Sequence, residues 1–99
     1  MKKYAISFDL ETSENDKRQD SYNKAEEYLQ SFEYYVKPLD NLYLIATSES
    51  SSIEIRDYLE SIFRKNDCIL VLGLDGDRAG YNSIENNKMI RDLLSKWRF

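Results

Sequence analysis

The carboxylate of Asp9 is the first side chain whose type and position could support chemistry. Asp9 ends the run YAISFD (residues 4–9), in which bulky apolar residues alternate with small or polar ones, and a polar segment follows over residues 11–19. Such alternation is typical of a half-buried strand. Two roles are open for Asp9: a metal-binding or catalytic group at the strand end, or a structural group that accepts hydrogen bonds from the backbone of the next loop. The residues alone favour the structural role.

Other reactive residue types are scarce. The chain has no histidine and a single cysteine, Cys68. The lack of histidine excludes the usual zinc sites, histidine-based triads and the common near-neutral proton shuttle. The single cysteine excludes an intramolecular disulfide. Cys68 lies in the apolar run CILVLGL (residues 68–74), which predicts a buried, unreactive thiol rather than a nucleophile.

The segment Asp75-Gly76-Asp77 resembles the start of a calcium-binding loop. An EF-hand loop counted from Asp75 requires glutamate at its twelfth position, where this chain has Asn86. We therefore expect a turn rather than a calcium site, because Asp-Gly is a common turn pair.

Charge and aromatic content bear on nucleic-acid binding. The formal net charge of −4 argues against broad electrostatic attraction to nucleic acid or to an anionic membrane. We expect the few basic clusters to be solvated surface charges. These clusters are Lys17-Arg18, Arg64-Lys65 and Lys96/Arg98. The side chains of Tyr34, Tyr35 and Tyr43 could stack on bases, but packing in a core or an interface is favoured.

Length and hydropathy set the broad class of the protein. The 99 residues fit one domain over 1–99, and no linker or repeat divides them. No apolar run approaches the roughly 18 residues that a membrane helix needs. The opening MKKYAIS lacks the long apolar stretch of a signal peptide. We expect a soluble protein in the reducing cytoplasm, with no membrane partner.

The elements that would position Asp9 follow from periodicity and caps. Strands are predicted over residues 3–10, 34–38, 42–47 and 68–74. Helices are predicted from an N-cap at Asp20 or Ser21 to about Phe32, from the capping box Ser51-Ser52-Ile53-Glu54, and from about Ser83. This order predicts an α+β protein: a ferredoxin-like βαββαβ sandwich with an additional C-terminal helix.

The two faces of the predicted sheet differ. Tyr4, Ile6 and Phe8 are expected beneath the helices, which leaves Ser7 and Asp9 on the opposite, helix-free face. The third and fourth strands are apolar on both faces, so both faces need cover. The C-terminal helix or a second subunit could cover the helix-free face. A symmetric homodimer is favoured, because it is the commonest assembly of soluble proteins.

Several segments of the chain resemble those of a known family. The opening YAISFDL (residues 4–10), the predicted element order and the segments KNDCILV (65–71) and DRAGY (77–81) resemble the CRISPR-associated protein 2 superfamily. Within that superfamily the chain is most similar to the SinR-like proteins and the virulence-associated protein D toxins. The resemblance covers nearly the whole chain and implies a homodimer of ferredoxin-like subunits.

The resemblance also implies a role for Asp9. In nuclease members, an aspartate at the end of the first strand faces its symmetry mate and holds a divalent metal. The corresponding residue here is Asp9, which becomes the candidate catalytic and metal-binding residue for Mg²⁺ or Mn²⁺. Two functions stay open in defence or toxin–antitoxin biology: an endonuclease acting on RNA or DNA, and a non-catalytic adaptor that binds a protein partner. The acidic chain and the lack of further catalytic groups near Asp9 depart from the nuclease pattern.

Overall fold

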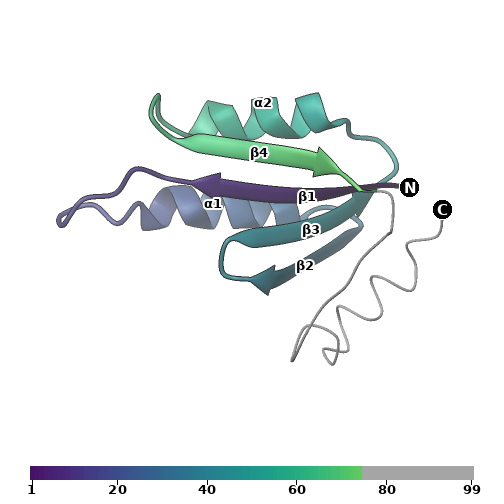
Figure 1. The fold of residues 1–99 in the computed structure, drawn as a ribbon, viewed down its shortest axis with the longest axis horizontal. Helices are drawn as coiled ribbons and strands as arrows, with labels where there is room; N and C mark the ends of the chain where they lie inside the picture. Colours follow the sequence, from purple (N-terminus) through teal and green to yellow (C-terminus); the bar gives the residue numbers. More distant parts are fainter. Residues whose placement is uncertain (75–99) are drawn as a thin grey trace.

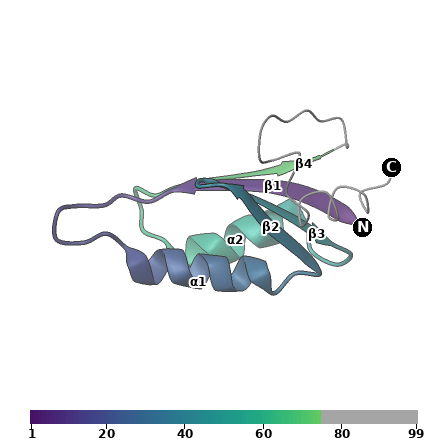
Figure 2. The ribbon, with the colours of Figure 1, turned by 90° about the horizontal axis from the view of Figure 1, so that it is seen from below.

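The structure, a computed structural model, describes residues 1–74. Its elements are β1 (Lys2–Asp9), α1 (Gln19–Gln30), β2 (Tyr34–Leu39), β3 (Leu42–Thr47), α2 (Ser52–Ile62) and β4 (Cys68–Gly73). The four strands form one antiparallel sheet in the order β2-β3-β1-β4, and both helices lie on the same face (Figures 1 and 2). The protein is therefore α+β, and the arrangement is compatible with a ferredoxin-like fold. The predicted C-terminal helix and the Asp75–Asp77 turn lie outside the described residues.

The core fills the space between the helices and one face of the sheet. Phe8 of β1 is central to it: its ring stacks on that of Tyr43 at 5.1 Å between centroids, and the ring of Phe63 lies 5.2 Å away. The largest fully buried side chains are Tyr43, Ile6, Leu29, Ile45, Ile55 and Leu59. The predictions that the bulky residues of β1 face the helices and that Tyr43 packs in the core are confirmed.

The start of α2 follows the predicted capping box. The Ser51 hydroxyl accepts the Glu54 N–H at 3.2 Å, and the Glu54 carboxylate accepts the Ser51 N–H at 3.3 Å. The N-cap prediction for α1 was wrong. That helix begins at Gln19, and its N-cap is Arg18, which has a left-handed backbone (φ 60°, ψ 32°) and makes no side-chain cap bond. The physical reason is tertiary, because the Arg18 side chain is bound to Asp67 across the molecule.

The helix-free face has an exposed apolar part along β4. Antiparallel register places Leu70 opposite Ser7 and Leu72 opposite Ala5, so these side chains share the helix-free face. Leu70 is 55% exposed and Leu72 is 50% exposed. The prediction that Ser7 and Asp9 point away from the helices is confirmed. Within residues 1–74 there is no helix long and apolar enough to cross a membrane.

Candidate functional site at the end of β1

Asp9 is the last residue of β1 and is exposed on the helix-free face. Its partner across the strand pair is Cys68, the first residue of β4. Residues directly opposite each other in an antiparallel pair project to the same side of the sheet. Cys68 is exposed as well, so the prediction of a buried thiol was wrong. The run around Cys68 is apolar, but β4 is an edge strand and position 68 lies on its helix-free side.

The carboxylate of Asp9 is not engaged by the loop that follows it. Among residues 1–74, no group donates a hydrogen bond to it. The N–H of Glu11, which an aspartate closing the strand would accept, is donated to Asp67 at 2.8 Å. The Ser7 hydroxyl donates to the Asn41 carbonyl at 2.8 Å, so its proton is also turned away from Asp9. The structural role predicted for Asp9 is therefore filled by Asp67.

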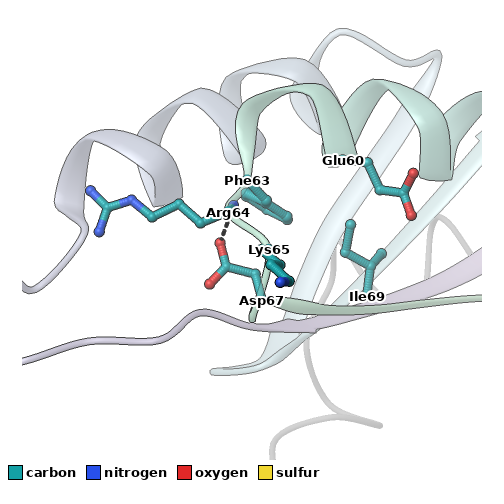
Figure 3. A pocket seen from close by; sticks show the side chains of 6 residues that line it. All are labelled: Glu60, Phe63, Arg64, Lys65, Asp67 and Ile69. Atoms are coloured by element: carbon teal, nitrogen blue, oxygen red, sulfur yellow. Dashed lines mark hydrogen bonds between the residues drawn. The ribbon is translucent and has the colours of Figure 1, made fainter.

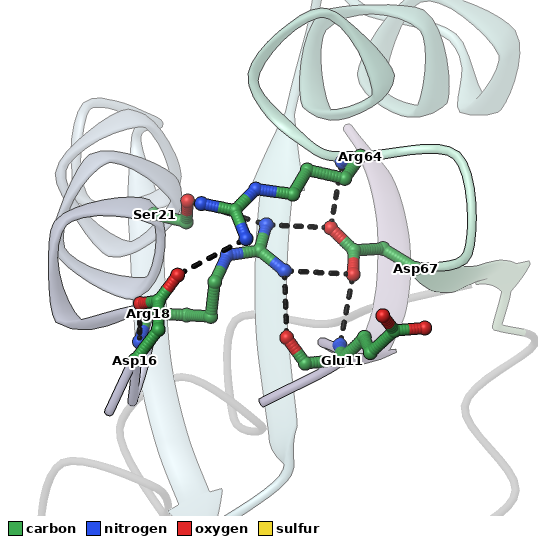
Figure 4. Close-up of polar contacts among 6 residues, drawn as sticks. All are labelled: Glu11, Asp16, Arg18, Ser21, Arg64 and Asp67. Atoms are coloured by element: carbon green, nitrogen blue, oxygen red, sulfur yellow. Dashed lines mark hydrogen bonds and ion pairs between the residues drawn. The ribbon is translucent and has the colours of Figure 1, made fainter. Parts of the chain in front are cut away.

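Asp67 and Arg18 form a buried ion pair beneath this end of the sheet (Figure 4). Arg18 donates Nη1 to one Asp67 oxygen at 3.0 Å and Nη2 to the other at 2.7 Å. The exposed fractions of the two side chains are 1% and 0%. Two parallel, charge-assisted bonds of this kind are the strongest geometry available to a carboxylate and a guanidinium.

The same contacts fix the charges of both groups. The hydrogen bond from Arg18 is the main reason that the pKa of Asp67 lies well below its usual range, and it outweighs burial, which acts in the opposite direction. Backbone N–H groups of Arg64 and Glu11 lower the pKa of Asp67 further. The hydrogen bond to Asp67 in turn raises the pKa of Arg18 above its ordinary value. Both groups are therefore charged throughout the neutral range.

The expectation that Lys17-Arg18 is a solvated pair was wrong for Arg18, which is 3% exposed. Arg64, from the second basic cluster, does fit the expectation, because its side chain is 64% exposed and pairs with Asp16 at 3.0 Å. Sequence reasoning missed both Arg18 and Asp67 as important residues. They lie 49 positions apart, and no periodic pattern or motif links them.

A pocket of about 320 Å³ opens beside this ion pair, between the end of α2 and the start of β4 (Figure 3). It is lined by Glu60, Phe63, Arg64, Lys65, Asp67 and Ile69. Both oxygens of Asp67 are already occupied by N–H donors. The pocket therefore presents no free buried carboxylate, and Asp9 is not among its lining residues.

A divalent metal needs several oxygen ligands gathered at one place. Residues 1–74 hold no group of three or more histidine, cysteine, aspartate or glutamate side chains arranged to bind a metal ion. At the position that the family resemblance implies, the described residues offer a single exposed carboxylate, that of Asp9. A divalent cation takes several oxygen ligands, of which Asp9 could supply one.

Comparison of the chain with family models, with curated proteins and with solved structures gave no match. A proposal for its function therefore depends on the geometry of Asp9 and on the surface around it.

Proposed function

We propose that the chain forms a homodimer of ferredoxin-like subunits, each with an additional C-terminal helix, and cleaves RNA or DNA with Mg²⁺ or Mn²⁺ held by the two Asp9 carboxylates. The observation that carries this proposal is the state of Asp9. Its carboxylate is exposed at the end of a central strand and accepts no hydrogen bond from residues 1–74. A structural aspartate would accept hydrogen bonds from the neighbouring backbone, whereas a carboxylate that binds a cation must have its oxygens available.

The helix-free face supports self-association. Leu70 and Leu72 each leave about half of their surface in water on this face. Full burial of a leucine side chain is worth roughly 1.5–3 kcal/mol relative to exposure, so covering both is favourable. A symmetric dimer covers the same patch on both copies at once. A two-fold axis close to the end of β1 would bring the two Asp9 side chains together.

The paired carboxylates explain why a cation is required. Two close carboxylates repel each other unless a positive charge lies between them. Mg²⁺ and Mn²⁺ favour oxygen ligands, which Asp9 supplies. A divalent cation held there would supply Lewis-acid activation of a phosphodiester and of water, which suits a chain without histidine. The chain's own contributions are to hold Asp9 in place and to keep an apolar surface around it.

The test is incubation of the purified protein with labelled RNA and DNA, with Mg²⁺, with Mn²⁺ and with a chelator. We expect cleavage that the chelator abolishes and that Asp9→Asn lowers by about 100-fold or more, because a catalytic metal is worth several kcal/mol. Asp57→Asn is the matched control, since Asp57 is an exposed carboxylate on α2 that, within residues 1–74, pairs only with its neighbour Arg56. Cleavage that survives Asp9→Asn at the wild-type rate would exclude this mechanism.

A non-catalytic adaptor is the second candidate, and the surroundings of Asp9 favour it. The Ser7 hydroxyl proton is committed to the Asn41 carbonyl. Ser7 therefore supplies no proton for a leaving oxygen. For the adaptor, we expect a dimer of normal stability, no cleavage under any metal condition, and no effect of Asp9→Asn on dimer mass.

A further inference from the structure

We infer that the buried Arg18–Asp67 pair is a positioning device for Asp9, which fixes the backbone where the chain leaves β1. The inference rests on the proposed function, because positioning matters only if Asp9 binds a metal. Neither Arg18 nor Asp67 touches the proposed metal site, and both would act through the main chain.

The Arg18–Asp67 pair binds both polar backbone groups of Glu11, two positions after Asp9. The Glu11 N–H donates to Asp67 at 2.8 Å, and the Glu11 carbonyl accepts Arg18 Nη1 at 2.9 Å. Leu10, which lies between Asp9 and Glu11 in the chain, is buried, with 4% of its surface exposed. A shift of the backbone at Leu10 or Glu11, directly after Asp9, would therefore break these contacts or expose Leu10.

The same carboxylate anchors the strand opposite Asp9. Asp67 directly precedes Cys68, the β4 residue that pairs with Asp9. The Arg64 N–H donates to Asp67 at 2.7 Å, which fixes the turn before β4. Asp9 is therefore held from its own strand end and from the facing strand, and both anchors converge on one buried side chain (Figure 4).

Asp67 itself has no capacity left for chemistry. One of its oxygens accepts Glu11 N–H and Arg18 Nη1, and the other accepts Arg18 Nη2 and Arg64 N–H. A buried carboxylate saturated in this way stiffens its surroundings. It can be neither a metal ligand nor a base, which leaves positioning as its contribution to the site. Partners that orient a metal ligand typically change metal affinity by about 10–100-fold when they are removed.

The test compares Mn²⁺ dissociation constants, measured by calorimetry on folded protein, for wild type and Asp67→Asn. The substitution keeps the shape of the side chain but turns one acceptor into an N–H₂ group facing donors. We expect Mn²⁺ affinity to fall by about 10–100-fold. Glu33→Gln is the matched control. The Glu33 carboxylate accepts the Ser48 N–H at 3.0 Å and the Ser48 hydroxyl at 2.8 Å, and it fixes the opposite end of the sheet. The Mn²⁺ affinity of the Glu33→Gln variant should match that of the wild type.

A folded Asp67→Asn variant with wild-type Mn²⁺ affinity would overturn the inference. If Asp67→Asn does not fold, the double variant Arg18→Met/Asp67→Leu replaces it, because exchanging a buried ion pair for apolar residues is often tolerated. The same criterion applies to that variant, since it also releases the Glu11 backbone.

Failure of the proposed function is a separate result. It is shown if wild type binds no Mn²⁺, or if Asp9→Asn binds it equally well. In that case hydrogen exchange at the amides of Leu10 and Glu11 tests whether the Arg18–Asp67 pair fixes the backbone after β1. We expect faster exchange at these amides in the Asp67 variants and no change in Glu33→Gln. Unchanged exchange at these amides would show that the pair does not fix the strand end.

Discussion

Arg18 and Asp67 face each other through two parallel hydrogen bonds of 3.0 and 2.7 Å, although they are 49 positions apart in the chain. The contact ties the loop after β1 to the turn before β4. Such a buried pair adds little net stability compared with apolar residues of the same shape, but removing one partner leaves a buried charge without compensation. Its value lies in fixing one arrangement of two segments that local sequence preferences leave free.

The first prediction concerns acid stability. The pKa of Asp67 is lower in the folded protein than the value of about 3.9 expected when it is unfolded. A carboxylate with a depressed folded pKa stabilises the fold above its unfolded pKa, and this contribution is lost as the pH falls toward the folded pKa. We expect Asp67→Asn to lower the free energy of unfolding by roughly 3–5 kcal/mol near pH 7. The difference from wild type should stay constant down to about pH 5 and shrink below about pH 4.

Urea unfolding of wild type and Asp67→Asn across this pH range measures that difference directly. Because every other carboxylate is shared by the two proteins, the difference isolates Asp67. A gap that keeps its full size at the lowest pH at which both proteins still fold would contradict the assignment.

The course of the backbone follows from local patterns in the sequence. Alternation in β1 predicts both the strand and the face that carries Asp9. The residues of the capping box predict the start of α2 within one position. These signals are reliable because each depends on groups that lie within a few residues of one another. The strand that contains Pro38, β2, lies at the edge of the sheet. This position suits proline, which lacks the donor that an inner strand needs.

The site was harder to predict because its contacts are long-range. Whether Arg18 is solvated or buried depends on Asp67, which no local pattern associates with it. The burial of Cys68 was misjudged because an apolar run does not reveal which strand lies at the edge of the sheet. The start of α1 was also predicted wrongly because of a long-range contact: the bonds of Arg18 to Asp67 outweigh the capping preference of Asp20 or Ser21.

The second prediction tests the capping box of α2. The Ser51 hydroxyl accepts the Glu54 N–H, whereas Ser52 is the first residue of the helix itself. We expect Ser51→Ala to lower the free energy of unfolding by about 1 kcal/mol. Ser52→Ala, one residue later, should change it little, because alanine is a good helix former. Chemical denaturation of the two variants beside wild type measures both values, and equal losses would show that the box does not stabilise the helix.

The third prediction concerns alkaline pH. Tyr43 is 1% exposed, and burial raises the pKa of its phenol far above the ordinary value of about 10. The folded state therefore favours the neutral phenol, and its contribution to stability is complete below about pH 10 and is lost as the pH rises further. We expect Tyr43→Phe to lose less of its free energy of unfolding than wild type between about pH 10 and 12. Parallel alkaline titrations by tyrosinate absorbance and circular dichroism measure this, and identical profiles would argue against it.

The fourth prediction uses Cys68 as a reporter of self-association. Its thiol is exposed in one subunit and lies on the helix-free face, two residues from Leu70. If a second copy covers this face, alkylation by iodoacetamide should be slow wherever the dimer is populated and should speed up on dilution. Leu70→Arg places a charge in the proposed interface, which is unfavourable to bury without a partner. We expect that variant to be monomeric by light scattering, at 11.7 kDa, and to be alkylated rapidly at every concentration.

Tyr58→Arg is the matched control for Leu70→Arg. Tyr58 is 48% exposed, close to the exposure of Leu70, but it belongs to α2 and stacks on Tyr28 of α1 within the helix layer. The new charge therefore lies away from the helix-free face, and both the mass and the alkylation rate should match those of wild type. Rapid alkylation of the wild type at all concentrations, together with a monomeric mass, would contradict the proposed dimer. The symmetric pairing of Asp9 would be lost with it, because each subunit alone supplies one carboxylate at that position.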